Sequence, residues 1–233
     1  MNAKMDEQPV GSKVDPLPSG VKPDGRPLFG RYVTLEHVSA EKHGAALYRS
    51  FAEGDAQETL WTYMGYGPFD SSETFQSWLK EREKSLDPLF YAFVPKKIGE
   101  ASGMGSFMRQ DAPNGVIEIG HIWMSPSLQN TSEGSEAIYL MMRHALEDLG
   151  VRRLEWKCDA LNAPSRAAAD RLGFVFEGIF RQHYVVKGRN RDTAWYSIIN
   201  TEWKPVRDAF EKWLQPTNFD GKGRQITPLK ARR

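Results

Sequence analysis

Two side chains that can transfer protons stand close together in one apolar segment, EIGHIWMS, at residues 118–125. Glu118 and His121 suit general base catalysis, because a partly desolvated carboxylate or an imidazole can titrate near neutral pH. Strict alternation along a strand predicts that the two side chains lie on opposite faces, so that only one of them lines a given cleft. Glu118 is the first candidate for the base and His121 the second.

The same segment continues through Ser-Pro into a polar loop and then a helix, within EIGHIWMSPSLQNTSEGSEA at 118–137. A strand, loop and helix in this order direct unpaired helix N–H groups toward one point, which suits an anion such as a diphosphate. Glu133 brings a negative charge close to that point, unless Asn130 and Glu133 form a capping box in which the carboxylate turns back toward the backbone.

A second polar turn, Asn162-Ala-Pro-Ser165, also joins a strand to a helix. Asn162 suits an N-cap, Pro164 suits the first helical turn, and Gly173 suits the end of the helix. Structural roles explain each of these residues singly, so a ligand role for Asn162 and Ser165 depends on the first loop.

The elements around these residues predict a mixed α/β sheet with flanking helices. Strands are expected at 30–38, 89–96, 100–110, 115–125, 151–158, 174–186 and 192–203, and helices at 39–53, 71–86, 133–150 and 163–173. The strand, helix and strand between 115 and 158 require parallel pairing, whereas the strands from 89 to 125 are expected to be antiparallel. The polar stretch at 187–192 is expected to be a hairpin connection.

Composition is that of an ordinary globular chain. The 233 residues allow one domain, expected at 29–214, between a flexible arm at 1–28 and a basic, solvated tail at 215–233. The net charge of +1 does not favour nucleic acid or membrane partners, and the scattered His residues do not indicate a metal site. Cys158 is the only cysteine and is expected to pack in a strand. Without a disulfide pair or a secretion signal, we expect a cytoplasmic protein.

With both motifs in order, the chain resembles the GCN5-related N-acetyltransferase (GNAT) superfamily, and in particular its RimJ/RimL branch. The superfamily's pyrophosphate loop has Gln or Arg, two residues, Gly, one residue, and Gly or Ala. The matching residues here are Gln129, Ser132 and Gly134, with Ser132 in place of the first Gly. Further similarity to the branch lies in 135–137, 162–165, 172–174, Glu177-Gly178, Arg181, Arg191-Asp192 and Tyr196.

The resemblance implies a GNAT fold, in which the fourth and fifth strands of a mostly antiparallel sheet are parallel and splay apart around acetyl-CoA. Acetyl then passes directly to an amine. The cofactor would lie along Ile122, Trp123 and Met124, whose backbone supplies an oxyanion donor, and along Gln129, Asn130, Thr131, Ser132, Glu133, Gly134 and Ser135. Asn162 and Ser165 would hold its pantetheine or adenine end.

The resemblance also places Glu118 at the family's catalytic glutamate. The tyrosine that many members use as general acid is Ala169 here, so Ser165, Tyr184 or water would protonate the leaving thiolate. The expected acceptor is a small-molecule amine or a protein N-terminus, with Trp61 and Trp123 as candidate walls of its pocket. Two alternatives stay open, namely a CoA-binding module without catalysis and a protein-interaction module. The oligomeric state is expected to be monomer or homodimer.

Overall fold

The structure is a computed structural model that describes residues 8–52 and 56–231. Residues 1–7, 53–55 and 232–233 lie outside it, and with them the start of the expected arm, the last residue of the first expected helix and the end of the expected tail. The elements are, in order, β1 (Leu28–Phe29), β2 (Val33–His37), α1 (Ala40–Ala52), α2 (Ala56–Thr59), α3 (Ser72–Glu83), β3 (Leu89–Pro95), β4 (Gly103–Asp111), β5 (Val116–Met124), α4 (Ser132–Arg143) with a π-helical continuation (His144–Asp148), β6 (Arg153–Asp159), α5 (Ala163–Leu172), β7 (Val175–Val186), β8 (Arg189–Ile199) and α6 (Asn200–Trp213).

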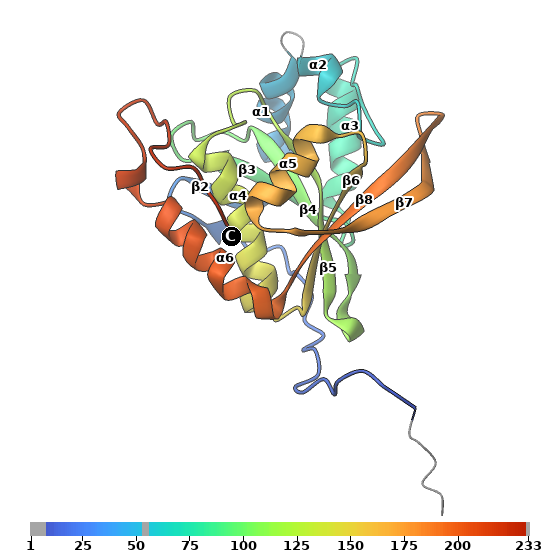
Figure 1. Ribbon diagram of the computed structural model, residues 1–233. Helices are drawn as coiled ribbons and strands as arrows, with labels where there is room; N and C mark the ends of the chain where they lie inside the picture. The colour runs from blue at the N-terminus through green and yellow to red at the C-terminus, as the bar shows by residue number, and fades with distance from the viewer. Residues whose placement is uncertain (1–7, 53–55, 232–233) are drawn as a thin grey trace, which may run out of the picture.

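One mixed sheet forms the centre of the molecule, with the strands in the order β1-β2-β3-β4-β5-β6-β8-β7 (Figure 1). Neighbouring strands are antiparallel except β5 and β6, which are parallel. The parallel pairing ends at Glu118 and Glu155, although β5 continues to Met124 and β6 to Asp159. The two strands therefore separate in the middle of the sheet, and the expected mixed α/β fold is confirmed.

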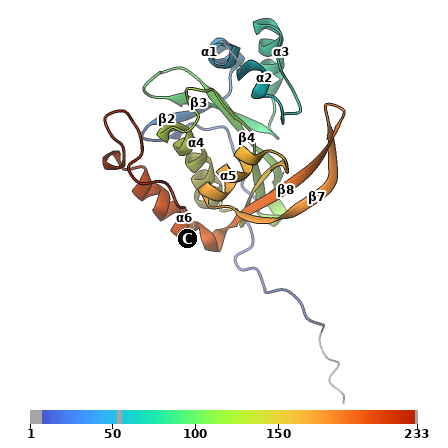
Figure 2. The ribbon, with the colours of Figure 1, turned by 45° about the horizontal axis from the view of Figure 1, so that its top comes forward.

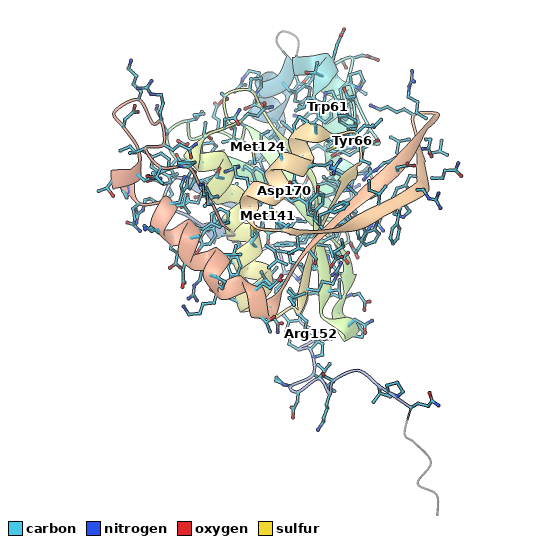
Figure 3. The ribbon with its side chains drawn as sticks, viewed as in Figure 1. Trp61, Tyr66, Met124, Met141, Arg152 and Asp170 are labelled. Atoms are coloured by element: carbon cyan, nitrogen blue, oxygen red, sulfur yellow. The ribbon has the colours of Figure 1, made fainter. Side chains whose placement is uncertain are left out.

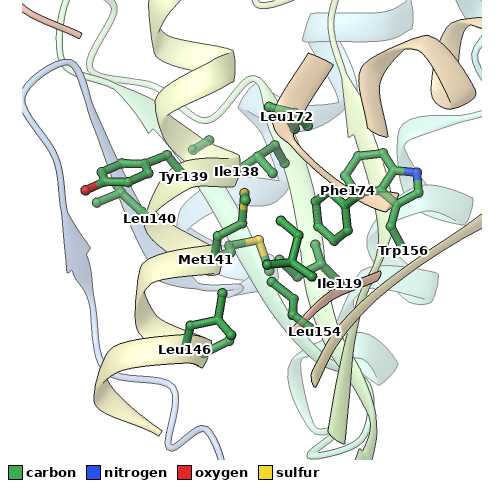
Figure 4. Packing of buried hydrophobic residues seen from close by; sticks show 14 of the residues in the cluster. Ile119, Ile138, Tyr139, Leu140, Met141, Leu146, Leu154, Trp156, Leu172 and Phe174 are labelled. Atoms are coloured by element: carbon green, nitrogen blue, oxygen red, sulfur yellow. The ribbon is translucent and has the colours of Figure 1, made fainter. Parts of the chain in front are cut away.

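Helices cover both faces of this sheet (Figure 2). One core lies under α4, α5 and α6, where Ile119 and Leu154 of the sheet meet Met141 of α4 (Figure 4). A second core lies under α1 and α3 and is rich in aromatic rings, among them Phe51 and Phe75. Each apolar helix face thus has its own side of the sheet to bury against.

The last expected strand, at 192–203, is wrong in its last four residues. β8 ends at Ile199, and α6 begins at Asn200. Trp203, Val206, Phe210 and Trp213 are all buried, and their spacing of three or four residues is that of one helix face. The apolar residues before and after Asn200 therefore belong to two different elements.

The expected solvated tail is also partly wrong. Leu229 and Ala231 are 5% and 4% exposed and belong to the core under α4. The Asn218 amide donates to the carbonyls of Trp213 and Thr227, which ties the returning chain to the end of α6. At the other end, the Ser19 hydroxyl donates to the Leu149 carbonyl at 2.8 Å.

Within the described residues, no helix has the length and apolarity needed to cross a membrane.

Candidate active site

A β-bulge lies in β5 just beyond the end of its pairing with β6. Gly120 pairs with Ser106 of β4 and Trp123 pairs with Met104, so β5 has one residue more than β4 between these pairs. His121 lies within this interval and has a left-handed φ of 51°. A bulge of this kind interrupts the alternation of side chains and re-aims them.

The bulge brings Glu118 and His121 to the same face of the sheet. Ile119, beside Glu118, packs into the core under α4, so Glu118 points toward the α1–α3 face. The His121 ring lies 5.6 Å from Tyr66 and 5.2 Å from Phe90 between ring centroids, also on the α1–α3 face. The expectation that Glu118 and His121 lie on opposite faces is therefore wrong, because it assumed uninterrupted alternation.

The Glu118 carboxylate is buried and ion-paired. Lys157 Nζ lies 2.8 Å from Glu118 Oε2, and Arg109 Nε lies 3.1 Å from the same oxygen. Lys157 also pairs with Glu155 at 2.6 Å. Burial raises the pKa of Glu118 above that of an exposed glutamate, while Lys157 and Arg109 oppose the rise. Glu118 is thus a carboxylate at the point of strand separation with increased basicity.

His121 is uncharged at neutral pH. Burial, together with the positive charges of Arg82, Arg109 and Arg191, lowers the pKa of its imidazole to about 4. The same positive potential acts on any ammonium group placed beside His121 and favours its neutral amine form. The surroundings of His121 therefore suit a neutral nucleophilic amine.

The two tryptophans expected as walls of an acceptor pocket lie in the core. Trp123 is 3% exposed and Trp61 is 0% exposed, and their rings are 5.5 Å apart. Tyr66, which the sequence did not single out, lies tilted against Trp78 with 4.6 Å between ring centroids, and its buried hydroxyl has no hydrogen-bond partner among the described residues. Trp61 and Tyr66 both belong to the segment between α2 and α3 (Figure 3).

The β7–β8 hairpin reaches toward the α1–α3 side of the molecule (Figure 2). Arg109 of β4 donates to the Tyr184 hydroxyl of β7, although three strands separate β4 from β7 in the sheet order. Lys187 Nζ, at the turn of the hairpin, donates to the Trp61 carbonyl at 2.7 Å. The hairpin turn expected at 187–192 is present at Lys187 and Gly188, whereas residues 189–192 already belong to β8.

The loop after β5 is ordered by its own side chains. Thr131 caps α4, since its Oγ1 accepts from the Gly134 N–H at 3.0 Å. The expected capping box of Asn130 and Glu133 is wrong, because α4 begins one residue later than that box requires. Glu133 accepts instead from the Ser132 hydroxyl at 2.9 Å.

Gly134 sits where no side chain fits. A Cβ at this position would lie 2.6 Å from the Leu128 carbonyl oxygen and 3.0 Å from Met124 Sδ. Gln129 Nε2 donates to the Met124 carbonyl at 2.9 Å and so ties the loop to the end of β5. Among the described residues, no acceptor is recorded for the backbone N–H groups of residues 130–133, which are therefore free to bind an anion.

Arg171 adds a positive charge beside this loop, which the sequence did not indicate. Its Nη1 donates from α5 to Ser135 Oγ at 3.3 Å, and within the part of the chain that the structure describes Arg171 has no ion-pair partner. A helix N-terminus and an uncompensated guanidinium together fit a diphosphate.

Asn162 and Ser165 lie at the start of α5, which follows β6. Asn162 Oδ1 accepts from the Ser165 N–H at 3.1 Å, and Ser165 Oγ accepts from Trp156 Nε1 at 3.1 Å. Asn162 therefore caps α5, as its structural role predicts, and a cofactor role for the remaining polar atoms of this turn stays a prediction. Burial raises the pKa of the neighbouring Cys158 thiol, as expected for a packed cysteine.

The predicted site residues fall into two groups. The first group follows β5, the loop after it and the start of α4, and consists of Glu118, His121, Ile122, Trp123, Met124 and residues 129–135. The second group lies at the start of α5, after β6, and consists of Asn162 and Ser165. The residues missed by the sequence are charged or aromatic side chains from other elements: Tyr66, Arg82, Arg109, Lys157 and Arg171. None of these has a local pattern, since each reaches the site only through the fold. Arg191 belongs to the branch resemblance, but no role in the site was predicted for it.

Comparison with known proteins agrees with this geometry. The acetyltransferase (GNAT) domain family matches residues 33–175. The ribosomal-protein-serine acetyltransferase of Escherichia coli is 28% identical over 166 residues, which cover 70% of this chain and 90% of that protein. The crystal structure of a GCN5-related N-acetyltransferase from Brucella melitensis has 45% identity and a TM-score of 0.88, and the match covers 91% of this chain and 96% of that one. RimL, a ribosomal α-N-protein acetyltransferase solved in complex with coenzyme A, shares the fold with a TM-score of 0.63 at 22% identity, over 75% of this chain and 98% of that one.

Proposed function

The chain belongs to the GNAT acetyltransferase family, and on this premise we propose that it transfers acetyl from acetyl-CoA directly to the amine of a protein N-terminus in a ternary complex. The observation that carries the proposal is the separation of β5 from β6 beyond Glu118. From Ile119 to Met124, the edge of β5 that faced β6 has no strand partner among the residues that the structure describes, so its N–H groups are available to a bound carbonyl.

The residues present fit acetyl-CoA. The N–H groups of 130–133 and the Arg171 guanidinium would bind its diphosphate, and the free edge of Ile122, Trp123 and Met124 would receive its pantetheine arm and thioester. Asn162 and Ser165, across the gap, would contact the pantetheine arm or the adenine. The cofactor supplies the activated acetyl group.

Glu118 is the proposed general base. The amine nitrogen forms a bond to the thioester carbon, the carbon–sulfur bond then breaks, and the amine proton passes to Glu118 directly or through water. The raised pKa of Glu118 favours this role, whereas the depressed pKa of His121 makes the imidazole a weak base. The released CoA thiolate takes a proton from Tyr184, Ser165 or water.

The choice of a protein N-terminus follows the names of two relatives. The Escherichia coli protein is named a ribosomal-protein-serine acetyltransferase, and RimL an α-N-protein acetyltransferase. An N-terminal amine also has a pKa near ~8, so it loses its proton more readily than a lysine side chain. We propose a cytoplasmic location as well, because the ribosomal proteins named for these two relatives are made in the cytoplasm.

The test compares Glu118→Gln with Glu155→Gln in an assay of CoA release from acetyl-CoA and N-terminal peptides. Both variants remove one carboxylate partner of Lys157, but only Glu118 lies where β5 leaves β6. We expect Glu118→Gln to lower kcat by roughly 100-fold and Glu155→Gln by less than about fivefold, since general base catalysis contributes ~10²–10⁴. Equal losses would assign Glu118 a structural role, and no turnover of any amine by the wild type would refute the transferase.

A further inference from the structure

Two arginines whose charges act on His121, Arg82 and Arg191, have no anionic partner in the described part of the chain. Within residues 8–52 and 56–231, no carboxylate lies within 4.0 Å of a nitrogen of Arg82 or Arg191, and the Nε atom of each is buried without an acceptor. The Tyr66 hydroxyl is also buried without a partner. Buried donors that lack acceptors are destabilising, so each of these groups would be stabilised by an external acceptor.

These donors are connected to β5 by two sets of contacts. In the first, the Arg82 guanidinium covers the Trp78 ring at 5.4 Å, Trp78 lies tilted against Tyr66, and Tyr66 stacks on His121. In the second, the Arg191 guanidinium lies 5.6 Å from the centre of the Tyr184 ring, and the Tyr184 hydroxyl accepts from Arg109, which pairs with Glu118. Both sets of contacts end on the part of β5 where it leaves β6, and both arginines lower the pKa of His121.

The positive charge of this cluster is only partly compensated. Arg109 and Lys157 share the Glu118 carboxylate, whereas Arg82 and Arg191 are uncompensated within the described residues. An amine that arrives as an ammonium ion would be repelled by this potential. An acceptor that carries an anionic group as well as its amine overcomes this repulsion. Its anionic group binds the guanidinium groups, while its amine is held in the neutral form.

We propose that the acceptor is an acidic peptide N-terminus, and that Arg82, Arg191 and the Tyr66 hydroxyl bind a carboxylate close to its amine. This inference rests on the proposed function, since it concerns the acceptor of the same site. One residue of extended peptide spans roughly 3.5 Å, so an Asp or Glu in the first positions after the amine would bring its carboxylate beside His121.

The test uses a matched pair of peptide amides that differ by one carboxylate, Ser-Glu-Ala-Ala and Ser-Gln-Ala-Ala. With wild-type protein we expect kcat/KM to be at least tenfold higher for the glutamate peptide. Arg82→Gln and Arg191→Gln should each reduce this preference severalfold, and the double variant should abolish it. Arg82→Lys should keep part of the preference for the glutamate peptide.

Lys80→Gln and Arg189→Gln are the control variants. They remove exposed cations from the same helix and strand and should leave the preference for the glutamate peptide unchanged.

A second readout does not depend on turnover. Calorimetric titration of the N-acetylated forms of both peptides, in the presence of CoA, should show tighter binding of the glutamate form to the wild type and equal binding to the double variant. Equal kcat/KM and equal binding of the two peptides by wild type would overturn the proposal, as would failure of both acetylated peptides to bind. The proposed function itself fails in a different way, by the absence of acetyl-CoA binding or of transfer to any amine.

Discussion

Replacement of His121 by Asn should make the protein less sensitive to acid. The pKa of His121 is lowered to about 4 in the folded protein, and a histidine in the unfolded chain titrates near ~6.5. Between these pH values the unfolded chain binds more protons than the folded one, so the free energy of unfolding falls as the pH falls. The two pKa values differ by about 2.5 units, and each unit corresponds to about 1.36 kcal/mol. At pH 4.5 most of this loss has occurred, and the free energy of unfolding is lower by about 2 to 3 kcal/mol because of His121.

The assay is urea unfolding of wild type and His121→Asn at pH 7.5 and pH 4.5. Asn suits the left-handed backbone of this position and does not titrate. The other titrating groups are common to both proteins, so the difference between the two pH-dependent changes reports on His121. Wild type should lose about 2 kcal/mol more than the variant between the two pH values. Equal losses would refute the assignment of a neutral, desolvated imidazole to the bulge.

Two further predictions concern the contacts that α4 makes with other elements. Glu136 accepts the backbone N–H groups of Arg31, Tyr32 and Val33 at 2.8, 2.6 and 3.0 Å, so Glu136→Gln should lower the free energy of unfolding by about 1–3 kcal/mol in urea. Glu133→Gln, three residues earlier in α4, is the control, and a similar loss in both variants would contradict the argument. Arg171→Met should weaken acetyl-CoA binding by about three- to tenfold in calorimetry and leave S-acetyl-pantetheine, which lacks the diphosphate, unaffected. An equal loss for both ligands would remove Arg171 from the diphosphate site.

Local patterns in the sequence predicted the parts of the fold that local forces determine. Ser71 caps α3 through a hydrogen bond from the Thr74 N–H, and Gly173 ends α5 in the left-handed conformation. The parallel pairing of β5 with β6 followed from the helix between them. The loop after β5 was located correctly as well, although its cap is Thr131 and not Asn130.

Features that depend on tertiary contacts were not predictable in this way. The bulge at His121 follows from how β5 pairs with β4, and a strand pattern of apolar residues does not reveal where one residue is added. Arg82, Arg109 and Arg191 are far apart in sequence and resemble ordinary surface cations until α3, β4 and β8 bring them to one imidazole. The clustering of these arginines makes the site positively charged, which the net charge of the chain does not indicate.

The branch resemblance gains a physical explanation at Glu136. Its carboxylate binds the backbone that leads into β2 and so fixes the start of α4 against the edge of the sheet. A Cβ on Gly30 would lie 2.6 Å from this carboxylate, so the approach of the two segments requires glycine there. The position of the proposed anion-binding turn therefore depends on a buried contact at another point of α4.

Calorimetric titration of acetyl-CoA into the wild-type protein, with Gly134→Glu and Gly221→Glu beside it, tests the central claim most directly. A Cβ at Gly134 collides with the Leu128 carbonyl, whereas Gly221 has open space around it. Gly134→Glu therefore adds a carboxylate inside the proposed cofactor site, and Gly221→Glu adds the same carboxylate outside it. The account predicts a Kd on the order of micromolar for the wild type and Gly221→Glu, and no measurable binding by Gly134→Glu. Absence of binding by the wild type, or equal binding by all three proteins, would contradict it.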